Sequence, residues 1–171
     1  SRTSFYWFFK DRAAILEALL ETWDAANTEA LVTACNEYAD TISEAVLNVI
    51  GLFLDEERFE PRFDFAIRGG AHQYDPVMAR VAAADERRLA AVQARVERCG
   101  IDEGGGDVRA RTVYLVQIGY ISMQVNEDLA TRMSRVPAYV KTYSGEAPTE
   151  RELARFYARH GLFPKEKAEG D

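Results

Sequence analysis

Residue types suited to contacting a nucleic acid gather in the first twelve positions of the chain. Serine, threonine and arginine come first, and such small polar or basic side chains could lie along a major groove and meet base edges. Tyr6, Lys10 and Arg12 could then reach flanking phosphates, while Phe5, Trp7 or Phe9 anchors the segment to its own core. The candidate DNA-contacting residues are Ser1, Arg2, Thr3, Ser4, Tyr6, Trp7, Lys10 and Arg12.

The segment resembles the end of the DNA-binding region in the TetR family of bacterial transcriptional regulators. In that family the recognition helix typically ends in a Thr/Ser-x-Tyr-x-x-Phe pattern, which is followed by a charged turn and a connecting helix. Ser4, Tyr6 and Phe9 carry the pattern here, and the stretch from Lys10 to Leu16 supplies the turn and the start of a helix. Phe8 departs from the pattern, because many members have histidine there.

The resemblance implies an all-α fold in two parts. Residues 1–12 would be the end of an incomplete helix-turn-helix domain whose first helices lie upstream, and residues 13–171 a helical ligand-binding and dimerisation domain. It further implies a repressor that binds operator DNA as a dimer and is released by a small-molecule inducer. The inducer would shift the connecting helix, expected from Asp11 to Trp23, and so change the spacing of two DNA-reading heads.

Composition limits the other classes of function. The 171 residues carry a formal net charge of −7, which argues against general nucleic-acid binding by most of the chain. No apolar run approaches the roughly 18 residues of a membrane span. Cys35 and Cys99 lack metal-ligand spacing, so we expect reduced thiols and a cytoplasmic location. No catalytic motif, metal site or cofactor site is expected, and a metal bound by His72 and Asp75 is disfavoured.

Apolar residues recur at helical spacing along the chain, and no stretch alternates with period two. Asp11 is expected to cap the first helix, Asn27 or Thr28 the second, and Asp75 the long helix up to Cys99. The glycines at 104–106 predict a flexible loop, and Pro137 predicts a break within 126–145. Further helices are expected at Ile42–Leu54, around Phe63–Gly70, at Asp107–Gln124, and at Thr149–His160 with a Thr149–Glu152 capping box.

The helices expected at Pro76–Cys99 and Asp107–Gln124 carry more apolar surface than one short chain needs, which predicts a homodimer. Asp85 and Arg88 fall on or beside the apolar stripe and need partners. They would pair with each other on one helix or pair across a symmetric interface. The candidate interface residues are Asp85, Arg88, Leu89, Val92, Val96, Val116, Gly119 and Met123.

Polar and aromatic groups on otherwise apolar helix faces suggest a small-molecule pocket. The clearest set is the stripe formed by Tyr114, Gln117 and Tyr120, although plain core packing with satisfied hydroxyl groups explains such residues as well. The candidate ligand-binding residues are Trp23, Phe53, Phe65, His72, Tyr114, Gln117 and Tyr120.

Three functions are weighed on these grounds. A ligand-responsive transcriptional regulator accounts for the first twelve residues and for the surplus apolar surface. An all-helical protein–protein interaction module would use the same long helices without binding DNA. A helical enzyme is the weakest of the three, because no nucleophile–base pair or metal constellation is present in the sequence.

Overall fold

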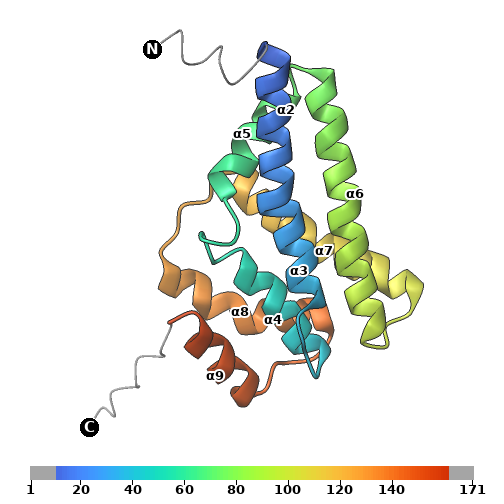
Figure 1. Ribbon diagram of the computed structural model, residues 1–171. Coiled ribbons are helices and arrows are strands. Elements are labelled where there is room, and N and C mark those ends of the chain that lie inside the picture. The colour runs from blue at the N-terminus through green and yellow to red at the C-terminus, as the bar shows by residue number, and fades with distance from the viewer. Residues whose placement is uncertain (1–10, 162–171) are drawn as a thin grey trace.

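The computed structural model describes residues 11–161, and this part of the chain is all-helical, as expected. Figure 1 shows the arrangement of the helices. In chain order they are α2 (Arg12–Trp23), the π-helical turn η1 (Asp24–Thr28), α3 (Glu29–Asn36), α4 (Ile42–Leu52), α5 (Pro61–Ala71), α6 (Asp75–Arg98), α7 (Glu103–Ser122), α8 (Leu129–Ser144) and α9 (Glu150–Arg159).

Several helix ends follow the predicted capping. Asp11 accepts a hydrogen bond from the backbone N–H of Ala14, and Thr149 and Glu152 form the full capping box. One predicted cap is wrong, because the cap of α6 is Tyr74 rather than Asp75. Thr28 is the N-cap residue of α3, as predicted, but its side chain makes no capping hydrogen bond, because η1 joins α2 to α3 without interruption.

Two other predictions fail at residues that usually interrupt helices. The glycines at 104–106 belong to α7, because Asp102 caps that helix by accepting from the Gly105 N–H at 2.7 Å. Pro137 lies inside α8 and does not break it. An interior proline costs a helix about 3 kcal/mol. In α8 that cost is offset by burial on both sides of the proline, at Met133, Val136, Val140 and Tyr143.

The helices enclose two hydrophobic cores. The larger core lies among α3, α4, α6, α7, α8 and α9, and the smaller one joins α2, α5 and the first half of α6. In Figure 1, α2 and α6 run side by side toward the N-terminal end, α7 crosses behind them, and α4, α8 and α9 gather at the opposite end. The described part of the chain therefore has two apolar regions, and α6 contributes residues to both.

Candidate functional site

An open groove of about 1050 Å³ lies between the ends of several helices. Its walls come from the end of α4, the start of α5, the second half of α7, the start of α8 and the end of α9. Apolar lining residues include Phe53, Phe65, Ile121 and Leu129, and polar ones include Arg62, Gln117, Tyr120, Glu127, Arg132 and His160. A groove with an apolar lining and a few converging polar groups is the usual form of a small-molecule site.

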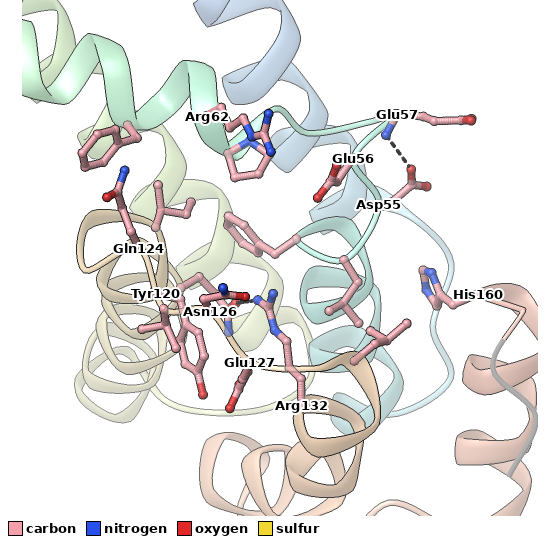
Figure 2. A pocket seen from close by; sticks show the side chains of 18 of the residues that line it. Asp55, Glu56, Glu57, Arg62, Tyr120, Gln124, Asn126, Glu127, Arg132 and His160 are labelled. Carbon is pink, nitrogen blue, oxygen red and sulfur yellow. Dashed lines mark hydrogen bonds between the residues drawn. The ribbon is translucent and has the colours of Figure 1, made fainter. Parts of the chain in front are cut away.

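Arg132 occupies the middle of this groove. Figure 2 shows its side chain rising from α8 into the hollow, with Asn126 and Tyr120 beside it and His160 across from it. The guanidinium group lies over the ring of Tyr120, 5.0 Å from the ring centroid, and donates to Oε1 of Gln117 at 3.4 Å. Burial lowers the pKa of Arg132, and the nearby Tyr120 and Glu127 only partly oppose that shift.

The polar groups around Arg132 have other partners. The Tyr120 hydroxyl lies 3.1 Å from the Tyr139 hydroxyl, and Glu127 accepts from Arg135 at 2.5 Å. Within the described residues, the second carboxylate oxygen of Glu127 is buried without a hydrogen-bond partner. Burial, followed by the charge of Arg159, lowers the pKa of His160, so this imidazole is neutral at pH 7.

A second polar cluster lies between the two cores, and its centre is the buried Asp64 on α5. One oxygen of Asp64 accepts from the indole N–H of Trp23 at 2.8 Å and from Arg88 at 2.9 Å. The other accepts from Arg68 at 2.7 Å. Asp64 and Arg88 have no exposed side-chain surface. We call the cluster the polar junction, and it comprises Trp23, Thr28, Asp64, Arg68, Asp85, Arg88 and Tyr114.

Arg68 extends the polar junction from α5 to α6 and α7. Its guanidinium donates to both oxygens of Asp85, at 2.9 and 2.5 Å, and to the Tyr114 hydroxyl at 3.0 Å. Tyr114 in turn donates to Asp85 at 2.5 Å. Burial raises the pKa of Tyr114, which keeps the phenol protonated. Two carboxylates and two guanidinium groups balance in charge, as buried ionic clusters require.

The structure separates the residues predicted to bind a ligand. Phe53, Phe65, Gln117 and Tyr120 line the groove together. Trp23 and Tyr114 are instead hydrogen-bonded within the polar junction. His72 is exposed at the end of α5 and lines neither.

Sequence reasoning missed Asp64 and Arg68 of the polar junction, and Arg132 and His160 of the groove. Asp64 and Arg68 are spaced i, i+4 on a short helix, and this spacing is typical of an ion pair. Arg132 was not identified, because the segment 126–145 was expected to be irregular. His160 was predicted only as the last residue of the C-terminal helix.

The predicted dimer residues also divide into two groups. Arg88, Val92 and Val96 are enclosed by helices of the same chain, at most 3 % exposed, and offer no surface to a second copy. Asp85 and Arg88 do not pair with each other, because Arg68 and Asp64 are their partners.

The rest of the predicted interface lies nearer the surface. Leu89 and Val116 are half-buried against the larger core. On α7, Gly119 has open space beside it, and Met123 is 78 % exposed.

Of the predicted DNA-contacting residues, only Arg12 lies within the described part of the chain, where it is exposed at the start of α2. Ser1, Arg2, Thr3, Ser4, Tyr6, Trp7 and Lys10 lie outside it. Among residues 11–161, no group of three or more histidine, cysteine or acidic side chains could hold a metal ion.

Two further results concern, in turn, the described helices and the whole sequence. No helix in the described range has the length and apolar character needed to cross a membrane. Comparison with known protein families, with curated proteins and with solved structures found no match.

Proposed function

We propose that the chain is the ligand-binding and dimerisation part of a TetR-like transcriptional regulator, in which the groove binds a small molecule. The support from sequence is the segment Ser4–Leu16 and its resemblance to the end of a helix-turn-helix domain. The support from structure is a connection between the groove and α2, the helix that follows this segment.

Two helices provide that connection, because each contributes residues both to the groove and to the polar junction. On α5, Arg62 and Phe65 line the groove, whereas Asp64 binds Trp23 of α2. On α7, Gln117 lines the groove, whereas Tyr114 binds Asp85. The Asp64–Trp23 hydrogen bond joins α5 directly to α2, and α7 reaches α2 only through Arg68 and Arg88, which bind both Tyr114 and Asp64. This connection is the observation that carries the proposal, because a ligand that shifts α5 would act on α2 through it.

The physical requirement for regulation is modest. A ligand changes DNA affinity only if it binds one arrangement of α2 better than another. A coupling of about 1–3 kcal/mol would change operator affinity by about 5- to 150-fold. Buried ionic hydrogen bonds suit this role, since their geometry tolerates little displacement.

The test uses the full-length gene product that contains this chain. We expect it to bind DNA flanking its own gene more tightly than random DNA, measured by fluorescence anisotropy at fixed salt. Arg12→Ala should weaken binding to every sequence, as the loss of a phosphate contact does. Arg151→Ala is the matched control, since Arg151 is exposed on α9, at the other end of the molecule (Figure 1). Equal affinity for flanking and random DNA would refute the proposal.

A further inference from the structure

Arg132 is a partly buried arginine that lines the groove. The buried or partly buried arginines Arg68 and Arg88 bind carboxylates, whereas Arg95 and Arg109, which lie outside the groove, donate to backbone carbonyl groups. Within residues 11–161, Arg132 has no carboxylate within 4.0 Å, and its one hydrogen bond is the long contact to Gln117. A partly desolvated guanidinium without an anionic partner is unfavourable unless something else supplies the negative charge.

The acidic groups of the groove supply that charge only in part. The charge of Glu127 raises the pKa of Arg132, but burial outweighs it and the ion pair of Glu127 is with Arg135. Asp55 accepts from the backbone N–H of Glu57 at 3.1 Å. In Figure 2, Asp55, Glu56 and Glu57 gather on the opposite wall, away from Arg132. Glu56 and Glu57 are exposed, so salt screens their repulsion of an anion at Arg132. A negative ligand group is therefore favoured beside Arg132 and disfavoured beside the acidic wall.

The other residues that line the groove indicate the chemistry of the rest of the ligand. Phe53, Phe65, Ile121 and Leu129 form apolar walls, and Tyr120 already stacks on the guanidinium. We propose that the groove binds an organic carboxylate with an aromatic or aliphatic body, whose carboxylate pairs with Arg132. The body lies against the apolar walls, and the Gln117 amide holds the guanidinium in place. This inference rests on the proposed function, because it names the class of ligand for the same groove.

The test compares acids with their neutral amides, which have nearly the same shape. The probes are naphthalene-2-carboxylate and octanoate, with naphthalene-2-carboxamide and octanamide as their counterparts, measured by isothermal titration calorimetry on this chain. We expect at least one acid to bind about tenfold or more tightly than its amide, because charge-assisted hydrogen bonds are about twice as strong as neutral ones. Arg132→Gln should remove this preference, and Arg132→Lys should retain only part of it.

Arg151→Gln is the control, because it makes the same change at an exposed arginine outside the groove. Arg132→Met keeps the apolar bulk of the side chain and checks folding, and its melting temperature should equal or exceed that of the unmodified chain. The proposal is overturned if neither acid binds at millimolar concentration, if acid and amide bind equally, or if the preference survives Arg132→Gln. These outcomes involve no DNA, so the carboxylate site and the regulator can fail independently.

Discussion

Among single residues, Asp64 has the largest predicted effect on stability. Burial alone would raise the pKa of its carboxyl group, but Arg88 and Arg68 outweigh burial and lower the pKa below its ordinary value. A carboxylate whose folded pKa is depressed stabilises the fold above its unfolded pKa of about 3.9, and that contribution is lost as the pH falls through the folded pKa.

We therefore predict that Asp64→Asn destabilises the chain at pH 7 by about 3 kcal/mol or more, because Arg88 is left buried without its counter-ion. The difference between the variant and the unmodified chain should shrink below about pH 4, as Asp64 itself becomes protonated. Urea unfolding at pH 7, 5 and 3 measures this. Asp107→Asn, in the exposed pair with Arg111, should change stability by no more than about 1 kcal/mol at any of these pH values. A difference independent of pH would contradict the assignment.

The sequence pointed to the polar junction without giving its pairing. Asp85 and Arg88 stood out because charges on an apolar face need partners. Their true partners, Asp64 and Arg68, lie on another helix, and only the packing of α5 against α6 and α7 brings them into reach. The same limit explains the groove, whose lining comes from three separated stretches of chain, 53–65, 117–132 and 159–160. Gln117 and Tyr120 were predicted to line a pocket because they lie on one face of the same helix.

Among the helices, α2 is the one through which the groove would act. The indole N–H of Trp23 donates to Asp64, and Asn27 both donates to and accepts from the backbone of Glu60, at 3.1 and 3.0 Å. These hydrogen bonds join the N-terminal part of α5 to the continuous helical segment formed by α2, η1 and α3. A displacement of α5 would strain these hydrogen bonds, and through them it would act on α2 under the proposed mechanism.

We predict that Trp23→Phe in the full-length gene product reduces the effect of ligand on DNA affinity. Phenylalanine keeps an aromatic side chain at this position but has no N–H group to donate to Asp64. DNA binding without ligand should change less than the ligand effect does. Anisotropy titrations with and without ligand measure both quantities. Thr22→Val is the matched control, since the Thr22 hydroxyl is exposed and bonds only within its own helix. An undiminished ligand effect in Trp23→Phe would place the coupling elsewhere.

Helix positions were predicted more reliably than helix interruptions. Apolar spacing located α2, α4, α6 and α9, and capping residues set two of their ends. Local propensity disfavours helix at 104–106 and at Pro137, by about 1 kcal/mol per glycine and about 3 for proline. At the glycines the Asp102 cap opposes this cost, and at Pro137 burial on both sides of the proline outweighs it. Single-sequence patterns do not report that burial.

For the molecule as a whole, the open question is what covers the outer side of α7. Val108, Leu115 and Met123 are 63 %, 53 % and 78 % exposed along it, and a Cβ added at Gly119 would meet nothing within 4 Å. Exposed apolar side chains in a row mark an association surface. A two-fold dimer would bury this row against its own copy, with Gly119 permitting close approach of the two helices.

We predict a homodimer in sedimentation experiments at micromolar concentration, and two kinds of variant separate association from folding. Leu115→Glu and Gly119→Trp should give folded monomers, because both change only the outer side of α7. Val92→Asp should instead unfold the chain, since Val92 is 2 % exposed within the larger core and a charge there has no partner. Circular dichroism distinguishes the two results. A monomeric mass for the unmodified chain, or a dimer that survives both α7 variants, would show that this side of α7 serves another purpose.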